Sequence, residues 1–265
     1  SSSVSGVGVN VAAALTRLGD EVGFLSLIGA DAAGDLALDG LSRLGVPTDG
    51  VLREMPATAQ SVILYDGDGR RQINVDLKDI QERRFPAGRF RAAAAGAGAF
   101  VLCNINFNRE LLPPARETGK PVLTDMHTLS DPADAYNADF MSAADALFLS
   151  DERLWAPPAE AARELSERYG CRVVVVGLGA KGALLLEKGR SPVTVPAVRA
   201  RKVVSTIGAG DALFSAFAHF HLAGRSAEES LRLATRFASW KIGETGAAAG
   251  FLSEAETLAL KGEPS

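Results

Sequence analysis

The sequence has only two cysteines, Cys103 and Cys171, among 265 residues. Two cysteines are too few for a disulfide framework or a zinc site. Cys103 follows one apolar run and Cys171 precedes another, so we expect both to be buried free thiols. No apolar run approaches the roughly 20 residues of a membrane span, and residues 1–5 lack a signal-peptide pattern. These absences predict a cytoplasmic protein without a membrane partner.

The sequence also has no excess of positively charged residues. The 28 Lys and Arg residues stand against 32 Asp and Glu residues, which gives a net charge of −4. A mildly acidic chain is a poor non-specific binder of nucleic acid, so we expect no nucleic-acid partner. Any anionic ligand must then be held by local geometry, because the overall field of the protein does not attract it.

The rest of the chain alternates between short apolar segments and helical segments. Strands are predicted at 22–28, 100–103, 122–124, 146–149 and 172–176, and helices at 11–19, 35–44, 158–169, 211–222 and 227–242. A further β-like stretch covers 183–195. Apolar strands without polar alternation indicate a parallel sheet that is covered on both faces. We therefore predict one α/β domain over 1–265, with a doubly wound and mostly parallel sheet.

Two features depart from this regular pattern. Segments 61–65 and 71–75 alternate in polarity around Asp66-Gly67-Asp68-Gly69, which is a strong hairpin signal. An inserted hairpin of this kind often forms a flap, so we expect 58–77 to be part of a small β lid. The chain also opens with three serines and a glycine-rich turn, which indicates that the first strand of the domain is missing from the sequence.

The segment with the clearest chemistry is Gly208-Ala209-Gly210-Asp211, which precedes a predicted helix. Glycine permits a turn whose backbone N–H groups point outward, and the N-terminus of a helix favours an anion there. A carboxylate at Asp211 could accept a proton from an attacking hydroxyl group. The same four residues could equally be a turn with Asp211 as an N-cap. The residues alone leave these two interpretations evenly balanced.

The order of several motifs along the chain favours the catalytic interpretation. Gly-Ala-Gly-Asp at 208–211 resembles the Asp-Thr-x-Gly-Ala-Gly-Asp signature of the ribokinase-like (PfkB) carbohydrate kinase family. Residues 5–10 (Ser-Gly-Val-Gly-Val-Asn) resemble its Gly-Gly-x-x-x-Asn element, and residues 179–182 resemble its Gly-x-x-Gly element after a strand. Further matches are Ile-Gly-Ala-Asp at 28–31 with Gly34, and Leu-Gly-Val at 44–46. The resemblance spans nearly the whole chain in the family's order.

This resemblance implies an ATP-dependent phosphotransferase that acts on a hydroxyl group of a sugar or a nucleoside, with Mg²⁺ held largely through water. It implies the following roles: Asp211 as the catalytic base, the backbone of Gly208, Ala209 and Gly210 as an anion hole, Gly179, Gly182 and Thr206 at the nucleotide, and Gly6 and Asn10 at the acceptor. The β lid would close over the acceptor and exclude water. A homodimer formed through the lid is allowed by the resemblance and is not indicated by the residues themselves.

The sequence departs from the family pattern at several positions. Ser5 replaces the first glycine of its pair. Ser205 stands where an Asp often helps to hold a monovalent cation, and Ile207 replaces a frequent Thr, which argues against activation by potassium. The family's Asn-x-x-Glu element, which organises Mg²⁺, aligns with 150–153 (Ser-Asp-Glu-Arg). Asp151 or Glu152 are alternatives for that role, so the metal ligands stay unassigned.

Two other functions are weighed against the kinase. Residues 177–182 match Gly-x-Gly-x-x-Gly, which is typical of a dinucleotide-binding dehydrogenase. Such a site also needs a following helix and an acidic residue about 20 positions further on. Residues 190–205 contain no Asp or Glu, which argues against this function. A non-catalytic sugar or nucleotide sensor on a kinase fold is favoured by the altered 150–153 element and disfavoured by Asp211. Asp125 and His127, at the end of a predicted strand, are open to either ligand contact or local capping.

Overall fold

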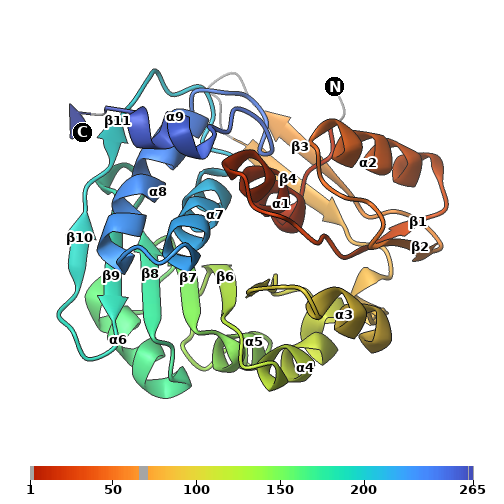
Figure 1. Cartoon of the computed structure of the whole chain (residues 1–265), viewed down its shortest axis with the longest axis horizontal. Coiled ribbons are helices and arrows are strands. Elements are labelled where there is room, and N and C mark those ends of the chain that lie inside the picture. The colour runs from red at the N-terminus through yellow and green to blue at the C-terminus, as the bar shows by residue number, and fades with distance from the viewer. Residues whose placement is uncertain (1–2, 66–70, 262, 265) are drawn as a thin grey trace.

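The structure is a computed structural model that describes residues 3–65, 71–261 and 263–264. Its main sheet has the strand order β10-β9-β8-β7-β6-β5 (Figure 1). The strands are β5 (Phe100–Val101), β6 (Val122–Thr128), β7 (Ala146–Ser150), β8 (Val173–Gly177), β9 (Ala183–Glu187) and β10 (Val193–Val195). β5 to β8 are parallel, whereas β9 and β10 are antiparallel additions at one edge. The predicted mostly parallel sheet is confirmed.

Helices cover both faces of this sheet, because successive strand residues point to opposite sides. Val174 and Val176 join a buried cluster with one set of helices, and Val173 and Val175 join a second cluster with the other set. The first set is α3 (Ala87–Ala94), α4 (Leu112–Glu117), α5 (Ala138–Ala143) and α6 (Pro158–Tyr169). The second set is α1 (Val7–Leu18), α7 (Ala209–Leu222) and α8 (Ala227–Lys241). This is the predicted doubly wound arrangement.

A smaller layer is built on β1 (Ser26–Gly29), β2 (Val51–Met55) and α2 (Ala32–Arg43), and β1 and β2 pair in parallel. Asp31 caps α2 by accepting the Gly34 N–H, and its carboxylate also accepts the hydroxyl and the N–H of Thr58. These hydrogen bonds, led by the one from the Thr58 hydroxyl, lower the pKa of Asp31 to about 2. Through these hydrogen bonds, the motif at 28–34 connects the N-terminus of α2 to the chain just before the hairpin.

The predicted hairpin is present as β3 (Gln60–Tyr65) and β4 (Arg71–Asp76), which form a two-stranded antiparallel sheet of their own. The turn predicted at 66–69 lies outside the described residues. Val62, Leu64 and Val75 are more than half exposed on this hairpin. Apolar side chains on a two-stranded sheet have little within the hairpin itself to bury them, so these face solvent in this structure.

The α1 helix begins four residues before the predicted start at residue 11, with Gly6 as its N-cap. The Asn10 N–H donates to the Gly6 carbonyl at 2.9 Å, so Asn10 lies inside the helix. Glycine is acceptable as an N-cap, although it is a weaker signal than Ser, Thr, Asp or Asn. The earlier start matters because it turns Asn10 toward α7.

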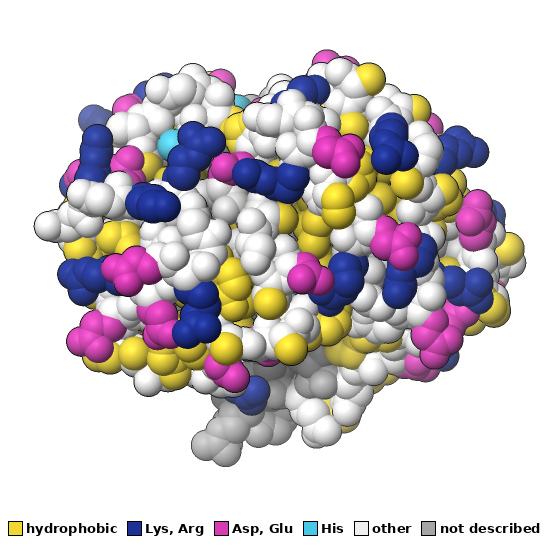
Figure 2. Space-filling view, turned by 90° about the horizontal axis from the view of Figure 1, so that it is seen from below, with side chains coloured by type: hydrophobic (Ala, Val, Ile, Leu, Met, Phe, Trp, Pro, Cys, Tyr) yellow, Lys and Arg dark blue, Asp and Glu magenta, His cyan; other side chains and the backbone are white. Residues whose placement is uncertain are grey.

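The remaining described elements are β11 (Val198–Arg199) with β12 (Glu263–Pro264), α9 (Glu254–Ala259), and the short 3-10 helices η1 (Ile80–Glu82), η2 (Asn106–Leu111) and η3 (Gly179–Lys181). Within the described residues, no helix has the length and apolar character to cross a membrane. On the face seen in Figure 2, Lys and Arg side chains are interspersed with Asp and Glu side chains.

Candidate active site

The turn before α7 presents free backbone N–H groups. Gly208 has a φ of 75°, and a Cβ atom there would lie 2.7 Å from the carbonyl oxygen of Ala247. Both its backbone angle and this close approach therefore require glycine. The Ala209 N–H donates to the Thr206 carbonyl at 3.2 Å, whereas the hydrogen bonds of the described chain leave the N–H groups of Gly208 and Gly210 without an internal acceptor. These two amides can hold an anion at the positive end of the helix dipole.

This geometry differs in one respect from the predicted anion hole, which included the amide of Ala209. That amide closes the turn in this structure. Thr206 contributes its carbonyl oxygen to the same turn, and its side chain is exposed. The turn is thus held by its own backbone and by Ala247, which fixes where the free amides point.

Asp211 lies in the first turn of α7, and its side chain is only 9% exposed. Asn10 donates its Nδ2–H to Oδ2 of Asp211 at 2.6 Å, although the two residues are 201 positions apart. Ser5 in turn donates its hydroxyl to Oδ1 of Asn10 at 3.2 Å. Oδ1 of Asp211 has no recorded hydrogen bond within the described residues, so this oxygen is available to accept a proton. The structure therefore brings the motif at 5–10 to Asp211, and Gly6 lies one helical turn from Asn10.

Two residues from the end of β6 complete the surroundings of Asp211. Asp125 is 7% exposed, and its Oδ1 accepts the backbone N–H of His127 at 2.8 Å. Nδ1 of His127 lies 3.4 Å from Oδ2 of Asp125. Side-chain atoms of Asp125, His127 and Asp211 all lie within 4.8 Å of one another. The sequence pointed to Asp125 and His127 only through their place at a strand end, without a link to Asp211.

His127 has an unusual backbone conformation, with a φ of 58°. Few residues other than glycine adopt this left-handed region, although histidine does so more readily than most. The pairing of β6 with β7 shifts register between Asp125 and Thr128, which is where His127 lies. The strand end is thereby bent, and the imidazole is held beside the two carboxylates. Such backbone strain is common where a side chain is positioned for function.

The pKa values in this cluster reflect burial and competing charges. Burial raises the pKa of Asp211, and so does the nearby charge of Asp125, while the hydrogen bond from Asn10 and the charges of His127 and Lys241 oppose the rise. Burial acts to lower the pKa of His127, but the hydrogen bond and charge of Asp125 and the charge of Asp211 together raise it above 6.5. Burial and the same carboxylates raise the pKa of Cys103 to about 12, so its thiol stays protonated.

The loop at 179–182 lies at the carboxyl end of β8 and leads through η3 into β9. The strand β9 follows here in place of an α-helix, which excludes a dinucleotide fingerprint of the Rossmann type. Gly182 has a φ of 104°, and a Cβ atom there would lie 2.1 Å from the Val195 carbonyl oxygen, whereas the surroundings of Gly179 are open. Gly179 and Gly182 have no recorded contact with Asp211. They share with it the sheet edge formed by the carboxyl ends of the parallel strands.

The 150–153 segment lies at the carboxyl end of β7, at this same edge. Ser150 accepts the Glu152 N–H at 3.3 Å, and Asp151 donates its N–H to the Gly177 carbonyl at 2.9 Å. In the described part of the chain, neither carboxylate of Asp151 and Glu152 has a recorded ion pair. These are oxygen ligands of the kind that Mg²⁺ prefers.

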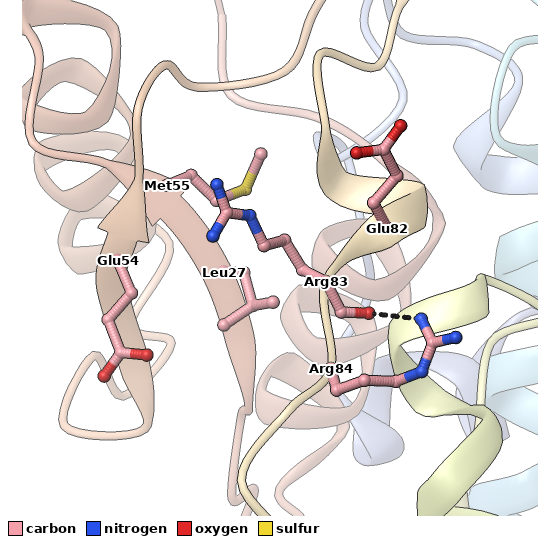
Figure 3. Close-up of a pocket in the computed structure, with 6 residues that line it drawn as sticks. All are labelled: Leu27, Glu54, Met55, Glu82, Arg83 and Arg84. Atoms are coloured by element: carbon pink, nitrogen blue, oxygen red, sulfur yellow. Dashed lines mark hydrogen bonds between the residues drawn. The ribbon is translucent and has the colours of Figure 1, made fainter.

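A pocket of about 240 Å³ lies elsewhere, between β1, β2 and the segment after η1 (Figure 3). It is lined by Leu27, Glu54, Met55, Glu82, Arg83 and Arg84. Figure 3 shows the Arg83 side chain extending toward Met55, and Arg84 donating to the Arg83 carbonyl. This pocket contains none of the residues around Asp211, so it is not the site described above.

Comparisons with known proteins are consistent across the chain. Residues 1–254 match the pfkB family of carbohydrate kinases. Acarbose 7(IV)-phosphotransferase from Actinoplanes sp. is 32% identical over 228 residues, which cover 85% of this chain and 75% of that protein. Ribokinase from Arabidopsis thaliana is 28% identical over 258 residues, or 91% of this chain and 68% of that protein. Among solved structures, the microbiome-derived acarbose kinase Mak1 has a TM-score of 0.86 at 25% identity, over 95% of this chain and 84% of that one.

The structure of Arabidopsis thaliana ribokinase complexed with ribose and ATP has a TM-score of 0.83 at 24% identity, over 97% of this chain and 86% of that one. A putative ribokinase II from E. coli, in complex with ATP and Mg²⁺, has the same TM-score at 19% identity, over 97% of this chain and 88% of that one. These two likenesses concern the fold.

The two glycines of the turn before α7 offer a matched test of this geometry. We expect Gly208→Ala to lower the free energy of unfolding by about 1–3 kcal/mol, because it combines backbone strain with a clash. Gly210→Ala should leave stability unchanged or raise it by up to about 1 kcal/mol, since a Cβ there meets nothing within 4 Å and alanine favours a helix. Urea denaturation of both variants measures the difference. Equal stabilities would contradict the close approach to Ala247.

The pairing of Asp125 with His127 predicts a measurable titration. In NMR spectra, the pKa of His127 should lie above 6.5 and should fall in Asp125→Asn, because only burial and the more distant Asp211 then act on it. Since the folded pKa exceeds the unfolded one, the interaction stabilises the fold fully below pH 6.5 and is lost as the pH rises through the folded pKa. The exposed control Asp39→Asn should leave the His127 titration unchanged. An unaltered His127 pKa in Asp125→Asn would contradict the pairing.

Proposed function

The chain belongs to the pfkB family of carbohydrate kinases, and on that basis we propose that it transfers the γ-phosphoryl group of ATP to a hydroxyl group of a sugar, with Asp211 as the base. The observation that carries this proposal is the arrangement at the N-terminus of α7. A buried carboxylate with one free oxygen stands in the same helical turn as two backbone amides that have no acceptor. One group can take the proton of an attacking hydroxyl, and the others can face the negative charge that develops on the transferred group.

Asn10 has a positioning role in this proposal. Its hydrogen bond occupies Oδ2 of Asp211 and leaves Oδ1 directed to the acceptor hydroxyl. His127 stands close enough to stabilise the ionised form of Asp211, and Asp125 holds the imidazole in place. With the Asn10 amide engaged by Asp211, the acceptor contact that the family resemblance gives to Asn10 would be indirect, through the carboxylate that it orients.

The residues at the sheet edge fit a nucleotide with its metal. Bound ATP would supply the γ-phosphoryl group, and Mg²⁺ would neutralise charge on its phosphates. The amides of Gly208 and Gly210 suit a phosphoryl oxygen, and Asp151 and Glu152 have carboxylates free to contact the water shell of a hydrated metal. Gly179, Gly182 and Thr206 are proposed to line the nucleotide on the side away from the acceptor.

The acceptor is proposed to be a monosaccharide or an oligosaccharide, because the relatives named above are called kinases of acarbose and of ribose. A nucleoside is the second acceptor class. The β3–β4 hairpin is proposed to act as a lid within a single domain that covers 1–265. Val62 and Leu64 lie on one face of this hairpin, and Val75 lies on the other. Closure over a bound substrate would bury one of these two faces, which also removes water from the transferred group.

A panel of acceptors tests the function directly. Acarbose, ribose, deoxyribose, fructose and inosine are each incubated with ATP and Mg²⁺, and the phosphorylated product is detected by mass spectrometry. A sensor that binds without catalysis would bind one of these compounds and give no product. A thermal-shift assay with an ATP analogue and the same panel separates two explanations for the absence of product. A sensor would show a raised melting temperature with one of the compounds, whereas a kinase whose acceptor is not in the panel would show no shift with any of them.

Asp211→Asn removes the proton acceptor and keeps the shape of the side chain. We expect kcat to fall by about 10²–10⁴-fold, the range typical of general-base catalysis, with a smaller effect on KM. In the wild type, kcat/KM should decline as the pH falls through the pKa of Asp211, which burial raises above 3.8. The measurement is steady-state kinetics with the acceptor that the panel identifies.

Asp39→Asn serves as the matched control, because Asp39 is exposed on α2 and, within the described part of the chain, forms an ion pair only with Arg43. Its kinetics should equal those of the wild type. Near-full activity in Asp211→Asn would show that another group is the base.

A further inference from the structure

Lys241 is a charged side chain that none of the roles above uses. It is the last residue of α8, and its side chain is 0% exposed. Its Nζ donates a hydrogen bond to the backbone carbonyl oxygen of Ile207, the residue just before Gly208. A buried ammonium group costs free energy unless its surroundings compensate for it, so its presence here calls for a physical reason.

One structural reason would be that Lys241 neutralises the carboxyl end of its own helix. The hydrogen bonds at that end argue against this explanation. The Trp240 carbonyl accepts Nε–H of Arg201 at 2.6 Å, and the Ile242 carbonyl accepts the N–H groups of Val204 and Ser205 at 2.8 and 3.0 Å. Other donors therefore satisfy the end of α8, and the ammonium of Lys241 reaches past it to the turn before α7.

The contact with Ile207 has a geometric consequence. In a trans peptide, the C=O and the following N–H point in opposite directions. The Ile207 carbonyl points inward to Lys241, so the N–H of Gly208 must point outward, toward the position proposed for the phosphoryl group. Gly208 has little intrinsic preference between backbone conformations. Without the ammonium, the Ile207 carbonyl would lose this donor, and only the Ala209–Thr206 hydrogen bond and the contact with Ala247 would hold the turn.

The charge of Lys241 also acts on the site. Burial lowers the pKa of Lys241 below 10.5, and the charge of Asp211 opposes that lowering. In return, Lys241 acts to lower the pKa of Asp211. A positive charge beneath the turn thus favours both the ionised base and an anion at the free amides.

We propose that Lys241 is a positioning residue for phosphoryl transfer, whose ammonium holds the Ile207–Gly208 peptide with its N–H toward the transferred group and supplies an internal cation to that turn. This inference rests on the proposed kinase function. It follows that the wild-type enzyme needs no monovalent cation from solution at this turn. Activity should be the same in potassium, sodium or tetramethylammonium salts at equal ionic strength.

Lys241→Met and Lys241→Ala separate charge from packing. Lys241→Met keeps most of the side-chain volume, and we expect kcat to fall by about 10²–10³-fold, as for loss of one oxyanion donor. Lys241→Ala leaves space beside the Ile207 carbonyl. Ammonium or potassium ions should therefore raise the kcat of this variant at least tenfold, whereas tetramethylammonium should not. Lys188→Met, at an exposed position between β9 and β10, is the control and should match the wild type.

Two kinetic results would overturn the inference: wild-type kcat in folded Lys241→Met, or no rescue of Lys241→Ala by any small cation. A measurement without substrate keeps the test independent of the kinase function. The amide signal of Gly208, identified in ¹⁵N-glycine spectra by its loss in Gly208→Ala, should move in Lys241→Met and stay in Lys188→Met. An unmoved signal would also overturn the inference. A wild type that phosphorylates nothing, with a Gly208 signal that moves, would contradict only the proposed function.

Discussion

The hydrogen bond between Asn10 and Asp211 is the interaction on which the rest of the site depends. A carboxylate that is nine-tenths buried needs a donor, and the chain supplies one from a helix 201 residues away. For the two side chains to meet at 2.6 Å, α1 must lie along α7, and both must pack on the same face of the main sheet. The buried residues of α1, α7 and α8 form a single apolar cluster with that face, so this packing fixes where Asp211, the proposed base, lies.

A balance of opposing charges surrounds this carboxylate. Burial and Asp125 favour the protonated form of Asp211, while Asn10, His127 and Lys241 favour the ionised form. A base must be ionised before it can accept a proton, and it is more effective when its pKa approaches the working pH. For the proposed base, the cluster meets both needs, because burial raises the pKa of Asp211 and the neighbouring cations limit that rise. The left-handed backbone of His127 and the burial of the Lys241 ammonium each lower the free energy of unfolding, and both belong to this arrangement of charges.

The sequence predicted the parts of the structure that depend on local pattern. The apolar run at 173–176 became a central strand, and the alternating segments around 66–69 became a hairpin. The turn at 208–210 was placed before the correct helix, because glycines and a helical pattern are both visible in sequence. Contacts between distant segments were not predictable in this way. The approach of Ala247 that requires Gly208, the amide of Asn10 on Asp211 and the ammonium of Lys241 on Ile207 each depend on three-dimensional packing. The early start of α1 was missed because glycine is a weak N-cap signal.

The departures from the family pattern bear on whether the chain is a catalyst or a sensor. Ser205 and the 150–153 segment lack groups that the family often has, and a sensor could tolerate both changes. A sensor could use the free oxygen of a buried carboxylate to bind a hydroxyl group, but binding alone does not explain the left-handed histidine and the buried lysine near it. Each of these lowers the stability of the fold, and apolar replacements of similar volume often cost no stability. Local violations of this kind collect where function requires them. The cluster around Asp211 is therefore better explained by phosphoryl transfer than by binding alone.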